Sequence, residues 1–223
     1  SLADIKIPES VRYIDEGAFE SCTSLTSITI PSSVEVMENY VFEDCFNLTS
    51  ATLLSEAPFV FSGCHYLERV TIGSNVTKIG DHAFEKCAIK SITIPSTVTT
   101  IGDSAFYQSE LENIKIPDSV TIIGDAAFAY CDKLKEVTIP DSVTVLQNHI
   151  FDACHSLEKI NLPNTLIGIE GDAFSGCESL KNLSLPSSLQ YIYEPVFENC
   201  SKLKDIYYQG TENDWNNLTI GYG

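Results

Sequence analysis

The chain has 223 residues, of which 43% are hydrophobic and 20% are charged, as in folded rather than disordered proteins. Its 13 basic and 31 acidic residues give a net charge of -18, which repels phosphate backbones, so we expect no nucleic-acid partner. No run approaches the ~18 apolar residues needed to cross a bilayer, so we expect no membrane insertion. The first residues lack the features of a signal peptide, and we expect a mature or excised fragment.

A short segment recurs along the whole chain. The pattern Leu-x-x-Ile-x-Ile-Pro first ends at Pro8 and ends again 23 residues later at Pro31. Further copies follow at steps of 22 or 23 residues, apart from one step of 19. The last position of the segment is occupied by Pro8, Pro31, Leu54, Gly73, Pro95, Pro117, Pro140, Pro163, Pro186 and Gln209. Since one such unit cannot bury its apolar side alone, the repeats are predicted to stack into a solenoid.

Each repeat is predicted to hold one strand and one short helical turn. Ile114 and Ile116 alternate as in a strand, which Pro117 closes because proline cannot extend a ladder. The spacing of residues 125–131 suits a helical turn with Asp125 as its N-cap. We therefore expect an α/β repeat solenoid, a right-handed superhelix with ten short parallel strands on one face and short helical turns or loops on the other.

Two repeat positions are predicted to lie in the interior. One is the phenylalanine column Phe19, Phe42, Phe61, Phe84, Phe106, Phe128, Phe151, Phe174 and Phe197. The other is the cysteine column Cys22, Cys45, Cys64, Cys87, Cys131, Cys154, Cys177 and Cys200, with Ser109 in the copy that lacks cysteine. Parallel stacked side chains do not supply the torsion of a disulfide, so we expect buried free thiols, with oxidation of a neighbouring pair as the alternative.

The repeats divide the chain into an array, residues 1–209, and a C-terminal capping segment, residues 210–223. Trp215 and Tyr222 follow the last strand and are expected to cover its open edge.

Side chains that could carry chemistry are few. Asp81, Asp103 and Asp125 share one repeat position, where calcium binding is possible in principle but helix capping is the simpler interpretation. The four histidines are scattered, and the chain has no phosphate-binding glycine loop, His-Glu-x-x-His motif or nucleophile elbow. We therefore predict no catalytic residue, no metal site and no cofactor.

The outward strand positions are predicted to form a polar surface that is open to solvent. Two outward positions and the adjacent rim position together hold eight of the basic residues but only six of the acidic ones, which leaves five basic and 25 acidic residues elsewhere. Such a nearly neutral face admits a protein partner without strong repulsion, although a stabilising ladder of opposite charges is the alternative interpretation. The residues predicted to contact a partner are Arg69, Lys90, Asn113, Lys115, Glu136, Thr138, Lys159, Asn161 and Tyr207.

The repeat unit Ile-Pro-x-Ser-Val-x-x-Ile-Gly-x-x-Ala-Phe-x-x-Cys-x-x-Leu, almost unbroken from Pro117 to Leu134, closely resembles the BspA-like (treponemal-type) leucine-rich repeat. The resemblance covers Leu2 to about Gln209. It implies a secreted or cell-surface protein, with adhesion to host proteins as the expected activity and no catalytic residues to carry over. The departures are the Cys-free copy and a four-residue deletion between Leu54 and Cys64, which leaves the curvature near Pro58 open.

The function favoured by the sequence is recognition of a host or neighbouring-cell protein through the strand face. One alternative is a stiff spacer that displays another domain. Another is a carbohydrate-binding module, which the lack of aromatic platforms on the strand face, apart from Tyr207, makes less favourable.

Overall fold

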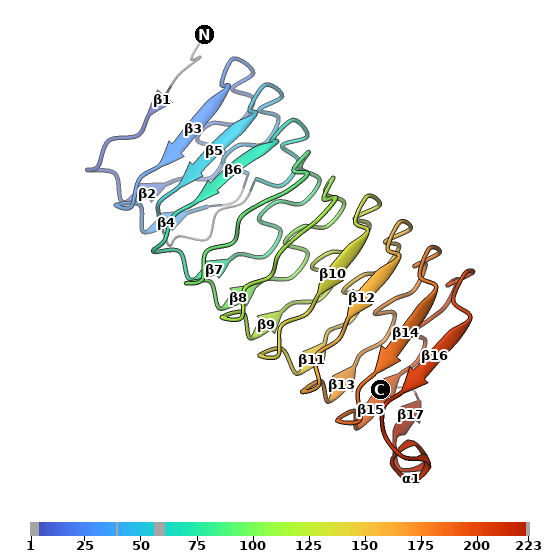
Figure 1. Cartoon of the computed structure of the whole chain (residues 1–223). Coiled ribbons are helices and arrows are strands. Elements are labelled where there is room, and N and C mark those ends of the chain that lie inside the picture. The colour runs from blue at the N-terminus through green and yellow to red at the C-terminus, as the bar shows by residue number, and fades with distance from the viewer. Residues whose placement is uncertain (1–4, 39, 56–60, 222–223) are drawn as a thin grey trace.

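The computed structural model describes residues 5–38, 40–55 and 61–221, which wind into an elongated stack of coils, one coil for each repeat (Figure 1). Strands on two faces of the stack run in parallel between neighbouring coils (Figure 1). The repeat solenoid predicted from the sequence is confirmed. Pro58 and Tyr222 lie outside the described residues.

The first row of strands lies where the alternating segments of the sequence predicted it, and we call it the strand face. Equivalent residues of successive repeats are paired, as in Val137 with Ile160 and Ile28 with Ala51. The pairing is parallel throughout, so residues that share a repeat position are neighbours in space. The strands are β1 (Ile5–Lys6), β3 (Ser27–Ile30), β5 (Ser50–Leu53), β6 (Arg69–Ile72), β10 (Glu136–Thr138), β12 (Lys159–Asn161), β14 (Asn182–Leu185) and β16 (Asp205–Tyr208).

Eight strands rather than the ten predicted form this face in the described part of the chain. Between β6 and β10, two coils contribute only an isolated bridge from Thr93 to Lys115. Both coils are one residue shorter than their neighbours in the loop that precedes the strand position. In a full-length loop, the Leu134 N–H donates to the Cys131 carbonyl at 3.0 Å and closes a tight turn. In the shorter loop, Glu110 N–H donates instead to Cys87 O of the preceding coil at 3.2 Å.

A second row of strands, which the sequence analysis did not predict, covers another face of the stack. Most of these strands have two residues, of which the first points outward and the second is buried. They stack in register like the first row, for example Ile101 on Ile123. The strands are β2 (Tyr13–Ile14), β4 (Val36–Met37), β7 (Lys78–Ile79), β8 (Thr100–Ile101), β9 (Ile122–Ile123), β11 (Val145–Leu146), β13 (Gly168–Ile169), β15 (Tyr191–Tyr193) and β17 (Thr219–Gly221).

The prediction of short helical turns is wrong. In the coil that contains Phe128, the residues Ala126 and Tyr130 have φ of 53° and 59°, in the left-handed region that interrupts an α-helix. The N–H groups of these three residues donate to carbonyls of the next coil at 2.7–3.0 Å. The N–H of Ala129, between them, donates to Ala126 O at 3.0 Å, three residues back. Along this segment, N–H groups donate in alternation to the turn itself and to the neighbouring coil. The fold is therefore a β-solenoid rather than an α/β solenoid.

The phenylalanine column is a continuous stack of rings inside the solenoid. Seven of the rings are buried, whereas Phe19 and Phe197 at the ends are partly exposed. Phe106 and Phe128 lie 5.5 Å apart between centroids with planes 4° apart, and Phe128 and Phe151 lie 5.6 Å apart with planes 7° apart. Such ring pairs contribute ~0.5–1.5 kcal/mol beyond the area that they bury. The column therefore links each coil to the next.

The cysteine column runs beside the phenylalanine rings, and its eight members are free thiols. Each thiol from Cys45 onward lies within hydrogen-bond distance of the carbonyl of a phenylalanine in an earlier coil, as in Cys154 Sγ to Phe128 O at 3.1 Å. Burial raises the pKa of Cys64 and of Cys131 to about 12, so these thiols stay protonated at neutral pH. The cysteines act as small interior side chains that also satisfy buried carbonyls.

This arrangement predicts a graded reactivity of the thiols in the native protein. Cys22 and Cys200, at the ends of the column, are partly exposed and should be alkylated first by iodoacetamide. Cys131, Cys154 and Cys177 should be protected until the chain unfolds, since burial raises their pKa and blocks access. Peptide mass spectrometry after timed alkylation measures this order. A count below eight reactive thiols in non-reducing denaturant would show that a neighbouring pair is oxidised.

The described part of the C-terminal segment adds a last strand and the one helix among the described residues, α1 (Glu212–Asn216). Thr211 and Asp214 form a capping box at the start of α1. The Trp215 ring lies 5.3 Å from the ring of Tyr208 on β16, and β17 pairs with β15. The segment thus continues the second row of strands beyond the last repeat.

Candidate partner-binding surface

The strand face presents the side chains that the sequence analysis assigned to partner binding. Eight of them are exposed, and Asn161 is half-buried. They lie on β6, β10, β12 and β16 and on the two coils without a full strand. Tyr207, which is 59% exposed, stands apart from the others on β16 at the C-terminal end of the face.

A hollow of about 500 Å³ lies on this face where the sheet is interrupted. Three of the predicted residues, Arg69, Asn113 and Lys115, line it together. Arg69 is held at one side, where its guanidinium donates to Thr49 Oγ1 at 3.3 Å and lies 3.7 Å from the Glu68 carboxylate. We call this hollow the face pocket. Its remaining lining consists of Glu68, Val70, Thr71, Ser91, Ile92 and Thr93.

Four other predicted residues form a hydrogen-bonded cluster on the adjacent strands β10 and β12. Lys159 Nζ lies 2.5 Å from Glu136 Oε1, and Asn161 Nδ2 donates to Thr138 Oγ1 at 2.9 Å. The hydrogen bond and charge of Lys159 lower the pKa of Glu136, so the pair remains ionised at neutral pH. These charges are therefore already compensated, and the cluster offers a partner an ordered polar surface rather than a free charge.

Lys90 and Lys115 differ from Lys159 in having no carboxylate among the described residues within ion-pair distance. Both are exposed, and Lys115 lies on the lining of the face pocket. Their charges are available to a partner, in a protein whose net charge is -18. The alternating charges of the rim do form one observed ladder pair, Glu158 with Lys181 at 2.9 Å.

Several residues that line the face pocket were not predicted from the sequence. Thr71, Ser91 and Thr93 line it but resemble the threonines and serines of every other repeat. The signal that could have located them is the pair of consecutive 22-residue steps, which end at Pro95 and Pro117. Two adjacent short repeats change the geometry of the sheet at one place, and an interruption of a regular surface is where a distinct site can form.

The aspartate column does not cap helices, so that prediction is wrong. Asp81 Oδ1 accepts a hydrogen bond from the N–H of Asp103 at 3.2 Å, and Asp103 Oδ1 accepts one from the N–H of Asp125 at 2.9 Å. Asp125 Oδ1 likewise accepts from the N–H of Asn148 at 3.1 Å. Each carboxylate thus binds the backbone of the next coil. No group of three or more His, Cys, Asp or Glu residues that could hold a metal ion occurs in the described part of the chain.

In the described part of the chain, no helix has the length and the apolar character that are needed to span a bilayer.

Comparison with known proteins agrees with this geometry. The profile of the BspA type leucine-rich repeat region matches residues 1–110 and 99–219, with six copies, and a search of curated proteins finds no match. A leucine-rich repeat protein from Bacteroides ovatus is 33% identical with a TM-score of 0.82, over 94% of this chain and 55% of that chain. The T. pallidum leucine-rich repeat protein is 27% identical with a TM-score of 0.54, over 76% of this chain and 71% of that chain.

A leucine-rich repeat protein from Eubacterium ventriosum shares the fold, with 20% identity and a TM-score of 0.58 over 94% of this chain and 78% of that chain. The present chain spans about half the length of the Bacteroides ovatus protein. The family profile covers nearly every repeat, and the observed strand register explains the spacing that the profile recognises. The chain belongs to the BspA-type leucine-rich-repeat family.

Proposed function

We propose that this chain is a non-catalytic binding module of a secreted or cell-surface protein and that it recognises a protein partner, such as a host extracellular protein, through the strand face. Solenoids of this kind commonly use their exposed sheets for interaction. The proposal on location rests on the family, whose members are expected at the cell surface. The residue assignments rest on the geometry of the face.

The observation that carries the proposal is the face pocket beside an ordered polar cluster. Arg69 and Lys115 bring two positive charges to the lining of the pocket, against one carboxylate from Glu68. Outside the two outward strand positions and the rim position, the chain has 25 acidic and only five basic residues, so an acidic partner meets less repulsion at the strand face than elsewhere. We therefore expect a partner that inserts an acidic or hydrogen-bonding side chain into the face pocket and lies over β10 and β12.

Charge reversal at Lys115 is expected to weaken this interaction about ten-fold, which corresponds to about 1.4 kcal/mol. Lys115 is exposed and has no ion-pair partner among the described residues, so Lys115→Glu should leave the stability nearly unchanged. A partner is first captured from host extracellular proteins on the wild-type array. Its affinity is then measured for the wild type and for the variants by surface plasmon resonance at two salt concentrations.

Lys78→Glu is the control for the change in net charge, because Lys78 is exposed on the second row of strands. Since Lys78 also lies 3.8 Å from the Asp81 carboxylate, thermal unfolding verifies that this variant keeps its fold. The proposal requires weaker binding by Lys115→Glu, unchanged binding by Lys78→Glu, and a smaller salt dependence in the first variant. Equal affinities for both variants would place the partner on another surface.

A further inference from the structure

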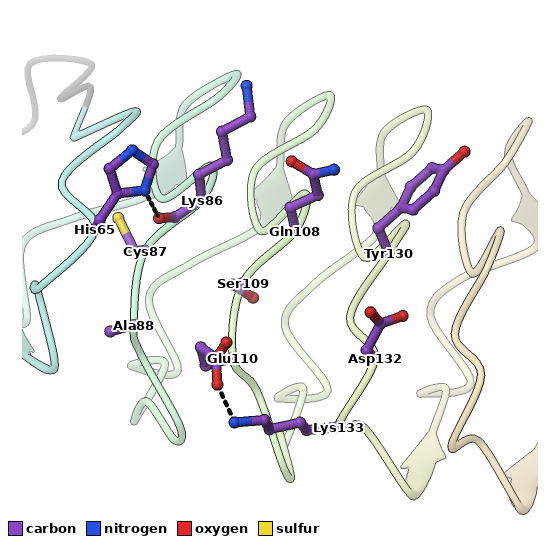
Figure 2. A pocket seen from close by; sticks show the side chains of 10 residues that line it. All are labelled: His65, Lys86, Cys87, Ala88, Gln108, Ser109, Glu110, Tyr130, Asp132 and Lys133. Carbon is purple, nitrogen blue, oxygen red and sulfur yellow. Dashed lines mark hydrogen bonds and ion pairs between the residues drawn. The ribbon is translucent and has the colours of Figure 1, made fainter.

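A second hollow, of about 430 Å³, lies at the rim of the array, and Figure 2 shows the side chains that line it. It shares no lining residue with the face pocket. We call it the rim groove. Its volume falls within the range of pockets that hold small ligands, ~300–1,000 Å³. Its lining residues are His65, Lys86, Cys87, Ala88, Gln108, Ser109, Glu110, Tyr130, Asp132 and Lys133.

The two shortened loops account for the groove. A full loop has two residues between the cysteine and leucine positions, as in Asp132 and Lys133, and these residues project at the rim. In the two coils between that of His65 and that of Asp132, this loop has only one residue, Ala88 or Glu110. The rim is therefore lowered over two consecutive coils and flanked by full loops on both sides. The position of the groove follows directly from the two missing residues.

Long side chains form one wall of the groove. Lys86, Gln108 and Tyr130 occupy the same position in three successive coils and project side by side from them (Figure 2). All three have a left-handed backbone, with φ of 57°, 55° and 59°. The same turn thus directs each side chain alike. Coils repeat at about 4.8 Å, so the wall presents a regular row of groups along the solenoid axis.

The charged side chains around the rim groove have hydrogen-bonding or ion-pair partners. Lys133 Nζ forms an ion pair with Glu110, and both residues lie opposite the row of long side chains (Figure 2). Lys86 Nζ lies 2.9 Å from a carboxylate oxygen of Glu85. Asp132 Oδ1 lies 2.6 Å from the His155 ring. Among the described residues, each charged side chain of the lining thus has a partner, and the charges of the two lysine–glutamate pairs cancel. This pairing distinguishes the rim groove from the face pocket, where positive charge is in excess.

The remaining groups suit a ligand rich in hydroxyls. His65 Nδ1 donates to the Lys86 carbonyl at 3.2 Å, which leaves Nε2 to form a hydrogen bond with a ligand. The Gln108 amide supplies both donors and an acceptor. The Tyr130 ring packs against Tyr107 at 5.2 Å between centroids, and Tyr130, which is 39% exposed, supplies an apolar surface with a polar tip. We propose that the rim groove binds a neutral oligosaccharide, with sugar rings packed against Tyr130 and hydroxyls bound by Gln108 and the paired charged groups. This ligand class differs from the protein partner of the strand face.

The test is titration of the isotopically labelled protein with three neutral linear hexose hexamers, namely maltohexaose, cellohexaose and mannohexaose. Backbone amide shifts in the NMR spectrum report where each sugar binds. We expect at least one hexamer at millimolar concentration to shift the amides of residues 86, 108, 110, 130 and 133. Tyr130→Ala should weaken this binding about ten-fold or more, whereas Tyr13→Ala, which removes an exposed tyrosine ring from the second row of strands, should not.

Because Tyr130 is exposed, its replacement is compatible with folding, and thermal unfolding of both variants verifies this. The proposal is overturned if none of the hexamers shifts the groove amides. It is also overturned if Tyr130→Ala binds as tightly as Tyr13→Ala, or if hexagalacturonate or a glycine-serine peptide binds the groove more tightly than every neutral hexamer. Lys115 lies outside the groove, so Lys115→Glu should leave sugar binding unchanged. Failure of the sugar proposal is therefore distinguishable from failure of the proposal for a protein partner.

Discussion

Replacement of Phe128 by alanine is expected to lower the free energy of unfolding by roughly 3–5 kcal/mol. The Phe128 side chain is fully buried in the middle of the array, and its ring is stacked on Phe106 and Phe151 at 5.5 and 5.6 Å. The substitution removes two ring contacts and leaves a cavity that rigid neighbouring coils cannot fill. Urea unfolding followed by far-UV circular dichroism measures the loss.

Phe46→Ala is the matched control for this experiment. Phe46 is 45% exposed and lies outside the stacked column, so its replacement should change the unfolding free energy by only about 0.5 kcal/mol or less. A loss below ~1 kcal/mol for Phe128→Ala would mean that the column does not hold the coils together.

Gly124→Ala is expected to destabilise the fold by roughly 1–3 kcal/mol, through overpacking of the backbone. A Cβ at Gly124 would lie 2.6 Å from the backbone nitrogen of Asp103 and 2.8 Å from the carbonyl carbon of Gly102. Both atoms belong to the preceding coil, so the coils must move apart. The shift would also disturb the hydrogen bond of 2.9 Å from Asp125 N–H to Asp103 Oδ1. Thermal and urea unfolding of the variant measure the effect.

Gly171→Ala provides the comparison, because a Cβ there meets its nearest neighbours at 3.7 and 3.8 Å, which is ordinary contact. That variant should be neutral, or more stable by ~0.4–1 kcal/mol through the lower entropy of its unfolded chain. Equal stabilities of the two variants would contradict the close approach of coils at Gly124.

The sequence predicted the parts of the fold that depend on periodicity. Register follows from the repeat, because the apolar positions of one unit can be buried only against the same positions of the next. Pairing of Val137 with Ile160 and stacking of the Phe128 ring on its neighbours are the direct result. The exposed positions of the strand face, such as Lys115, follow from the same alternation.

The predictions of a helix cap and of helical turns were wrong where the next coil supplies the hydrogen-bond partners. Asp125 has the spacing of a helix cap, yet its carboxylate accepts the N–H of Asn148 from the next coil. The N–H groups of Ala126 and Phe128 likewise donate to the next coil rather than to a helix. The sequence of one repeat in isolation does not reveal these hydrogen bonds, because the partner groups lie 22 or 23 residues away. Step length carried the missing information, since the two 22-residue steps mark both the break in the strand face and the rim groove.

The fold and both proposed binding surfaces depend on coils that stack in register, and methyl–methyl nuclear Overhauser effects test this stacking most directly. In the isoleucine-, leucine- and valine-labelled protein, we predict cross-peaks between Val137 and Ile160, Ile101 and Ile123, and Ile169 and Ile192, each pair one repeat apart. Cross-peaks that instead join residues at different repeat positions, with none between these pairs, would contradict the stacking and the assignment of both surfaces.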